Sequence, residues 1–229
     1  LILAGAGDMM FLVLGLLLTS LATFALVAYP DDDPATEAAM KYFVFGSVAG
    51  AVMIFGLTYW FGAAGSTMIA DLEGTEAIPL AVIFGLVAVI VGLGYKASLV
   101  PFHFWVPDAY EGGPLSVAAF LSVVPKVGAL FALTQVFRDL PSESGGPAVI
   151  AGLAVLSMTY GYLAALVQDN VVRLLAYSSI AQSGYFLLGI VALGESSFAL
   201  PSIIFFAAAY AAMNLGAFAV IAAIGRTLN

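Results

Sequence analysis

The chain has 229 residues, of which 63% are hydrophobic and only 9% charged, and its formal net charge is −8. About a quarter of the residues of a soluble domain are charged, so this composition excludes an ordinary soluble fold and indicates an integral membrane protein. The chain contains no cysteine, which excludes disulfides, thiolate metal sites and thiolate-ligated iron–sulfur clusters. Its single histidine argues against a haem or metal held by several histidines.

Long, continuous apolar runs predict an all-α membrane bundle rather than a barrel of alternating strands. Residues 1–5 are expected to be the tail of a preceding helix, and Asp8 can cap the first full helix. Asp33 is predicted to cap the second helix, with Pro34 at its first helical position. The sequence predicts seven membrane-spanning helices in chain order, over residues 9–29, 35–63, 78–100, 115–137, 148–167, 174–194 and 199–225.

The end of the third predicted helix carries an ionisable side chain. Lys96 follows the apolar run 78–93, and a lysine near the bilayer midplane costs at least about 2.5–3.5 kcal/mol. Pro101 and Pro107 each remove a helical hydrogen bond, so we expect this helix to be broken over residues 101–114. A broken helix with an ionisable group at depth is typical of transporter sites. The alternative is that Lys96 snorkels to an interface and has no transport role.

The other lysines, Lys41 and Lys126, also lie inside or near apolar helices, whereas most acids and the arginines lie in loops or at helix ends. Lysine can change its charge when buried and arginine cannot, so the titratable basic residue is kept for the interior. Glu37 and Lys41 have the favourable i, i+4 spacing, which fits either an interfacial ion pair or a part in a charge pathway. Lys126 follows Pro125 between valines, so we expect it to face inward.

The sixth predicted helix is rich in hydroxyl and amide side chains near its start. Such groups either line a hydrated path or hold helices together by hydrogen bonds. The residues concerned are Tyr177, Ser178, Ser179 and Gln182.

The arginines indicate an orientation. Counting alternate sides of the membrane, Arg173 and Arg226 share a side with the loops 30–34 and 107–114, and Arg138 lies opposite. The positive-inside rule makes the shared side cytoplasmic. Since the chain begins Leu-Ile-Leu-Ala without Met and ends directly after an apolar helix, we expect a fragment of a longer membrane protein.

Five segments together resemble the antiporter-like membrane subunits of respiratory complex I, a family related to the Mrp cation/proton antiporters. The forms Tyr-Glu-Gly-Gly-Pro and Ala-Tyr-Ser-Ser-Ile are most similar to subunit N of bacterial NADH:quinone oxidoreductase and to subunit 2 of mitochondria and chloroplasts. The resemblance covers nearly the whole chain in one register. The five segments are Glu37–Phe43, Gly92–Lys96, Pro101–Pro114, Ala118–Lys126 and Arg173–Tyr185.

The resemblance implies a fold of about fourteen helices, built on two inverted five-helix repeats that each contain one broken helix. Residues 1–229 would form a single transmembrane domain. Residues 9–137 would hold most of the first repeat, and residues 148–229 would begin the second.

The resemblance also implies a function. These subunits carry protons across the membrane, driven by electron transfer from NADH to quinone in other subunits. The chain would bind no cofactor or metal itself, and NADH, FMN, iron–sulfur clusters and quinone would belong to partner subunits. Its expected partners are the other membrane-arm subunits, the lipid bilayer and protons, with no nucleic acid. The expected location is the inner (plasma) membrane, which the chain would cross several times.

The resemblance assigns roles to particular residues. In the family, a lysine on the broken helix is the central proton carrier, which matches Lys96, and a lysine on the next helix matches Lys126. The lysine of the Glu-Ala-Ala-Met-Lys motif matches Lys41, which with Glu37 would couple to the neighbouring unit. The histidine of the Pro-Phe-His motif matches His103, a candidate relay beyond Lys126.

The sequence departs from the family in its first helix. The family usually places there a glutamate that pairs with the broken-helix lysine, but the register puts Leu17 at that position. A buried lysine without a counter-ion is favoured in its neutral form. Either another acid substitutes, with Glu37 as the candidate, or the protein is a divergent relative with reduced activity.

Two other functions fit the sequence. The chain resembles, less closely, a Mrp-type cation/proton antiporter subunit. It also fits a structural subunit that fills a membrane arm without pumping, because its first helix has no acid.

Overall fold

We describe the fold from a computed structural model, which describes residues 2–72, 80–138 and 145–228. This part of the chain is helical, with short 3-10 turns at Leu3–Gly5 and Ile69–Leu72. The α-helices are α1 (Met9–Val27), α2 (Asp33–Ala64), α3 (Leu80–Ala97), α4 (Trp105–Gly112), α5 (Leu115–Arg138), α6 (Gly146–Ala165), α7 (Val171–Val191) and α8 (Ala199–Leu228).

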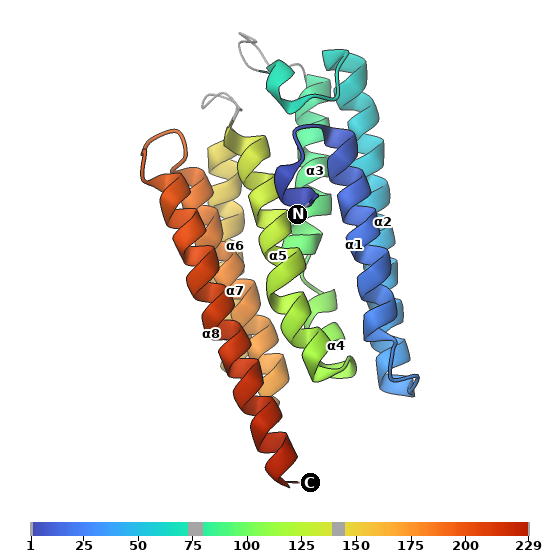
Figure 1. The fold of residues 1–229 in the computed structure, drawn as a ribbon. Helices are drawn as coiled ribbons and strands as arrows, with labels where there is room; N and C mark the ends of the chain where they lie inside the picture. The colour runs from blue at the N-terminus through green and yellow to red at the C-terminus, as the bar shows by residue number, and fades with distance from the viewer. Residues whose placement is uncertain (1, 73–79, 139–144, 229) are drawn as a thin grey trace.

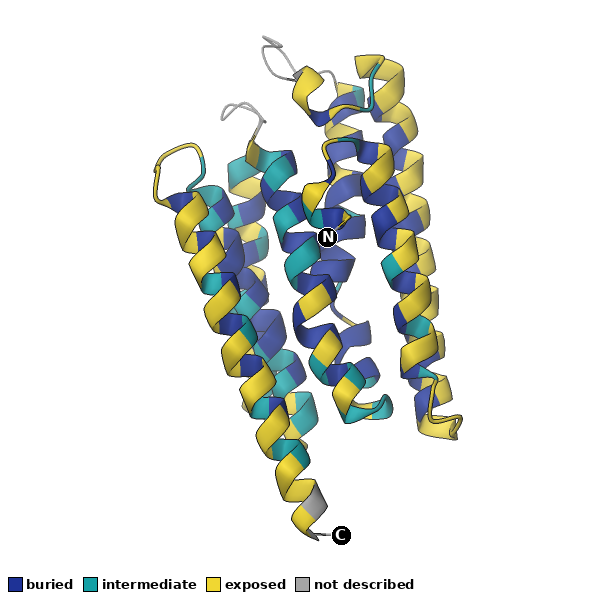
Figure 2. Cartoon of the chain, viewed as in Figure 1, coloured by how far each residue is buried: buried dark blue, intermediate teal, exposed yellow. Residues whose placement is uncertain are grey.

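The expected polytopic bundle is confirmed. Seven helices, all except the short α4, are long and apolar enough to cross a membrane. They run alternately up and down, with α1 and α2 on one side of the bundle and α6, α7 and α8 on the other (Figure 1). The inner helices α3 and α5 are the most buried, whereas α6 and α8 are the least buried of the seven. Figure 2 shows the same division, with exposed residues along the outer faces of α1, α2 and α8.

Glycines allow two helix pairs to approach closely. A Cβ on Gly56 of α2 would overlap the side chain of Ala88 on α3. A Cβ on Gly184 of α7 would lie 2.7 Å from the carbonyl oxygen of Ala154 on α6. Small residues at such crossings are how membrane helices gain van der Waals contact, since lipid removes the usual hydrophobic drive between helices.

The starts of the first two helices follow from their capping residues. Asp8 caps α1 as predicted, because its carboxylate accepts a hydrogen bond of 2.6 Å from the Met10 amide. The prediction for α2 was wrong by one residue. Asp32 is its cap and accepts from the Ala35 amide at 2.8 Å, which places Pro34 at the second helical position. Asp32 and Pro34 both fit the first turn, where the backbone N–H groups have no partner within the helix.

The later helices differ from prediction mainly at their ends. The helix α7 begins three residues earlier than expected because Asn170 caps it, accepting from the Val172 amide at 2.8 Å.

The N-terminal segment was expected to be a helix tail, and the structure has a 3-10 turn there. Gln135 of α5 holds this turn by donating to the Ala4 carbonyl at 2.5 Å.

The third predicted helix is broken, but earlier than expected. It ends at Ala97, and Ser98 follows with a φ of +64°. The Val100–Pro101 peptide bond is cis. Pro107 does not contribute to the break, contrary to prediction. It lies in the first turn of α4, where a missing amide hydrogen removes no helical hydrogen bond.

The backbone groups freed by the break are satisfied from neighbouring helices. Ser157 of α6 accepts from the Val100 amide at 3.0 Å. Ser183 of α7 donates to the Ala97 carbonyl at 2.8 Å. Irregular backbone at membrane depth needs such protein partners, since lipid offers none. The break is therefore held open by α6 and α7.

The arrangement also agrees with the expected grouping of the arginines and loops at the two ends of the bundle. Arg173, the loops 28–32 and 113–114, and the end of α8 that carries Arg226 lie at the same end of the bundle, and α5 ends in Arg138 at the opposite end (Figure 1). The division of the chain into repeats at 9–137 and 148–229 remains a prediction.

The two serines that hold the break give a stability prediction. Ser157→Ala leaves the part-buried Val100 amide without its partner, and we expect it to lower the free energy of unfolding by about 1–3 kcal/mol. Ser183→Ala is expected to cost less, about 1 kcal/mol, because the Ala97 carbonyl is an acceptor that tolerates loss of one donor better. Denaturant unfolding of the full-length protein in detergent measures both. Ser178→Ala, at a partly exposed position on α7, is the matched control, and an equal loss there would contradict the assignment.

Candidate functional site

Lys96 is the centre of the first polar site. It lies in the last turn of α3 and is 0% exposed. Its amine contacts three hydroxyl oxygens, those of Ser20 at 3.1 Å, Thr23 at 3.2 Å and Tyr42 at 2.9 Å. The amine also lies 5.2 Å from the centre of the Tyr42 ring. We call Ser20, Thr23 and Tyr42 the hydroxyl cage, and it comes from α1 and α2.

Aromatic packing fixes the Tyr42 member of the cage. The Tyr42 ring stacks on Trp105 of α4 at 4.2 Å between centroids and meets the edge of Phe24 at 4.7 Å. The Tyr95 hydroxyl donates to the Tyr42 carbonyl at 2.9 Å. These contacts hold the Tyr42 hydroxyl in one position next to the Lys96 amine. The cage is therefore tied to α4, the second half of the broken helix.

No acid takes the place of the family glutamate in the described part of the chain. The suggestion that Glu37 substitutes is wrong, because the Glu37 carboxylate pairs with Lys41 at 2.8 Å. Leu17 is 38% exposed and lies against Gly50 of α2. Within residues 2–72, 80–138 and 145–228, the polar contacts of the Lys96 amine are neutral oxygens.

Lys126 is the centre of another polar site. It faces inward as predicted and is 1% exposed. Its amine donates to the Ser179 carbonyl at 2.8 Å and to the Ser179 hydroxyl. That hydroxyl lies 2.7 Å from the hydroxyl of Tyr210 on α8 and 3.4 Å from the hydroxyl of Tyr110 on α4. The Tyr210 hydroxyl donates to the Ser122 carbonyl at 2.9 Å. Ser179 thus joins four helices around one amine.

His103 lies in the interrupted stretch between α3 and α4 and is 3% exposed. Its ring contacts the rings of Phe104 at 4.6 Å and Tyr160 at 4.5 Å. Its Nδ1 atom has no hydrogen-bond partner among the described residues. The contacts of His103 are therefore with aromatic rings, and its role as a relay beyond Lys126 remains a prediction.

Lys41 and Glu37 form the predicted ion pair as part of a larger charged cluster. Lys41 is 44% exposed and bridges Glu37 at 2.8 Å and Asp108 of α4 at 3.0 Å. Arg173 of α7 pairs with Asp108 at 3.2 Å and with Glu111 at 2.7 Å. We call these five residues the charged cluster, and it links α2, α4 and α7 at the end of the bundle. Exposed pairs of this kind contribute little stability each.

The sequence therefore identified both buried lysines and the exposed pair, but not their partners. Ser20 and Thr23 carry a weak signal, since residues three apart lie on the same face of a helix. Tyr42 and Tyr210 carry none, because tyrosine is common in apolar helices. Of the four residues singled out in the sixth predicted helix, Ser179 contacts Lys126. Gln182 lies instead on the surface, 3.4 Å from the Tyr162 hydroxyl.

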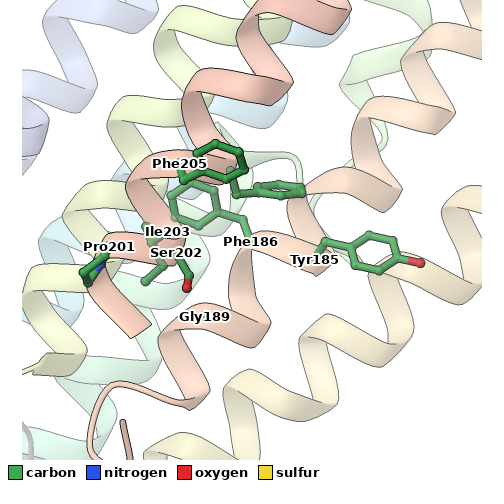
Figure 3. Close-up of a pocket in the computed structure, with 8 residues that line it drawn as sticks. Tyr185, Phe186, Gly189, Pro201, Ser202, Ile203 and Phe205 are labelled. Atoms are coloured by element: carbon green, nitrogen blue, oxygen red, sulfur yellow. The ribbon is translucent and has the colours of Figure 1, made fainter. Parts of the chain in front are cut away.

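A surface groove away from these sites contains none of these titratable groups. It lies between α7 and α8, has a volume of about 490 Å³ and is mainly apolar (Figure 3). The Tyr185 side chain extends away from the other labelled residues (Figure 3). Among the described residues, no group of three or more His, Asp or Glu side chains is placed to hold a metal ion. The expectation that the chain binds no cofactor remains untested.

The family model described as "NADH:quinone oxidoreductase/Mrp antiporter, TM" matches residues 6–229. Among curated relatives, the NADH-quinone oxidoreductase subunit N of Mycobacterium sp. (strain JLS) is 43% identical over 98% of this chain and 48% of its own length. That of Halorhodospira halophila is 40% identical over 99% of this chain and 48% of its own length. The chain spans about half the length of the curated relatives it matches.

Solved structures agree with the sequence matches. A chain of respiratory complex I from Thermus thermophilus superposes with a TM-score of 0.84 at 35% identity, covering 96% of this chain and 48% of that one. A chain of the Mrp complex from Dietzia sp. superposes with a TM-score of 0.86 at 23% identity, covering 95% of this chain and 41% of that one. The likeness to the Mrp chain concerns the fold alone.

The contact between Ser179 and Lys126 gives a prediction by double-mutant cycle. Ser179→Ala removes the hydroxyl, and we expect it to lower the free energy of unfolding by about 1.5–3 kcal/mol, the range for hydrogen bonds to charged groups. With Lys126→Met already present, the same substitution should cost less, because there is no amine left to lose its hydrogen bond to the Ser179 hydroxyl. Unfolding of the full-length protein in detergent gives the coupling, expected at about 1 kcal/mol or more. Equal costs in both backgrounds would show that Ser179 only holds helices together.

Proposed function

The chain belongs to the NADH:quinone oxidoreductase/Mrp antiporter membrane family, and we propose that its protein is a proton-translocating membrane subunit of an NADH-quinone oxidoreductase. The observation that carries the proposal is the placement of Lys96. A fully buried amine lies in the last turn of an interrupted inner helix, surrounded by neutral oxygens. An intramembrane ionisable residue is expensive, so its presence indicates a function in moving charge.

The chemistry of the site suits loading and release of a proton. Lysine changes its charge in a buried site, whereas arginine stays charged. Three hydroxyls stabilise an ammonium by hydrogen bonds, but they provide no formal negative charge to hold it permanently. Both charge states of Lys96 are therefore within reach, which a proton carrier requires.

Lys126 is the other carrier in the proposal. It lies on α5, which packs against the α3 helix that carries Lys96. Two positive charges ~10 Å apart at an effective dielectric of ~20 repel by about 1.7 kcal/mol. A proton on one lysine would therefore disfavour a proton on the other, and the two must be treated as one coupled set. Such coupling moves a proton along without any redox group on this chain.

The charged cluster and His103 would connect these lysines to their surroundings. Lys41 and Glu37 would couple to a neighbouring unit through Asp108, which lies on α4, on the far side of the break from Lys96. A change of charge at this exposed end would be felt through the broken helix. His103 would act as a relay, since the two ring nitrogens of an imidazole can take up one proton and release another.

The partners in this proposal follow from the names of the relatives. Other membrane-arm subunits would surround the chain, and NADH, FMN, iron–sulfur clusters and quinone would react elsewhere in the complex. The chain would lie in the inner (plasma) membrane and carry protons. A non-pumping structural subunit is the next candidate, because Leu17 stands where the family has its glutamate. The Mrp-type antiporter is the third, and respiratory or antiporter genes beside this one would separate the two transport functions.

The test is donor-driven proton pumping in membrane vesicles that contain the full-length protein in its complex. Lys96→Ala is expected to abolish pumping, because alanine holds no proton at the centre of the proposed path. Assembly is followed by the amount of complex in the membrane. Met213→Ala, on the exposed face of α8, is the control and should pump normally. Normal pumping by an assembled Lys96→Ala complex would contradict the carrier role of Lys96 and favour a structural subunit that does not pump.

A further inference from the structure

In the hydroxyl cage of Lys96, the direction in which the Thr23 hydroxyl donates its hydrogen bond is fixed. A threonine hydroxyl has one hydrogen to donate. The Thr23 oxygen lies 2.8 Å from the Thr19 carbonyl and 3.0 Å from the Ser20 carbonyl, both of which only accept. This back-bond to the preceding turn is common for threonine in helices. The Thr23 hydrogen is therefore used by the backbone, and its oxygen can only accept from Lys96 and Tyr42.

The direction at Tyr42 follows from that at Thr23. The two hydroxyl oxygens lie 3.0 Å apart, and one of them must donate. Because the Thr23 hydrogen is used by the backbone, Tyr42 donates to Thr23. The Tyr42 oxygen, 2.9 Å from the Lys96 amine, can then only accept from it.

Ser20 differs from the other two members of the cage. In the part of the chain that the structure describes, the Lys96 amine at 3.1 Å is the hydrogen-bond partner of its hydroxyl oxygen. The Ser20 hydrogen is thus free to point toward the amine or away from it. Ser20 is 5% exposed, so its hydroxyl is largely shielded from bulk water.

Counting hydrogens at the amine separates the two charge states. An ammonium has three N–H groups, and the cage offers one oxygen to each. A neutral amine has two N–H groups and one lone pair. Thr23 and Tyr42 can receive only the N–H groups, so the lone pair must face Ser20, whose hydroxyl can turn and donate to it.

We propose that Ser20 is the proton-exchange partner of Lys96. This inference deepens the proposed function and rests on Lys96 being a proton carrier. In the step, an N–H bond of the ammonium breaks and its proton forms an O–H bond on Ser20. The Ser20 hydroxyl passes its own proton to a water molecule on its other side. The products are a neutral amine that accepts a hydrogen bond from Ser20, and a protonated water.

The position of Ser20 gives this role a structural reason. It lies three residues after Leu17 on α1, one turn from the place where the family has its glutamate. A hydroxyl there supplies both a hydrogen-bond acceptor and a donor, where a carboxylate would supply charge.

The test compares single variants in the same vesicle assay, with the full complex. Ser20→Ala removes the exchanging hydroxyl, and we expect the rate of proton pumping to fall about 100-fold or more, the lower end of the effects seen when a positioned acid–base group is lost. Ser20→Thr keeps a hydroxyl and should restore most of the pumping. Ser47→Ala, at an exposed position on α2, is the matched control and should behave as wild type.

The outcomes are distinct. If Ser20→Ala assembles and pumps as wild type while Lys96→Ala does not pump, the exchange role of Ser20 is wrong and the proposed function stands. If both variants pump normally, the proposed function itself has failed. If Ser20→Ala does not assemble, Ser20→Gly takes its place. Glycine has no side-chain proton to exchange, so it should show the same loss, and normal pumping by it would overturn the inference.

Discussion

The structure depends on one constraint, the burial of two amines in a bundle that gives them hydroxyl and carbonyl oxygens as partners. Lys96 and Lys126 are almost completely buried, and their polar contacts in the described chain come from Ser20, Thr23 and Tyr42 and from Ser179. Each oxygen reaches its amine from another helix. Burial of an amine without such contacts would be prohibitive. The helices must therefore pack closely enough to bring these hydroxyls to the lysines, as the contact of Gly56 on α2 with Ala88 on α3 allows for these two helices of the Lys96 site.

The break between α3 and α4 serves the same purpose. It places Lys96 in the last turn of α3 and lets Trp105 of α4 stack on Tyr42. The cage and α4 are therefore in contact. The break is stable because Ser157 and Ser183 satisfy the freed backbone groups. A movement of α4 would therefore be felt at the Lys96 amine through the stacked rings. The charged cluster holds the other end of α4 to α2 and α7, where a neighbouring unit can reach it.

The two lysine sites differ in how many residues contact the amine. Three separate side chains surround the Lys96 amine, whereas one residue, Ser179, supplies both contacts of Lys126 that the structure describes. Lys126 is tied to α8 through Ser179 and Tyr210. The Lys96 site is thus closed by α1 and α2, whereas the Lys126 site faces the later helices α7 and α8.

The sequence alone determined the membrane class, the seven apolar helices and the buried lysines, because hydrophobic runs and misplaced charges are properties of short stretches. It also determined the Glu37–Lys41 pair, since i, i+4 neighbours meet within one helix. Only the tertiary structure decided which side chains contact the Lys96 amine. Ser20 and Tyr42 are far apart in sequence from Lys96, and neither hydroxyls nor tyrosines stand out in an apolar helix. The same holds for Ser157, Ser183 and Tyr210, whose roles arise only when three or more helices meet around one polar group.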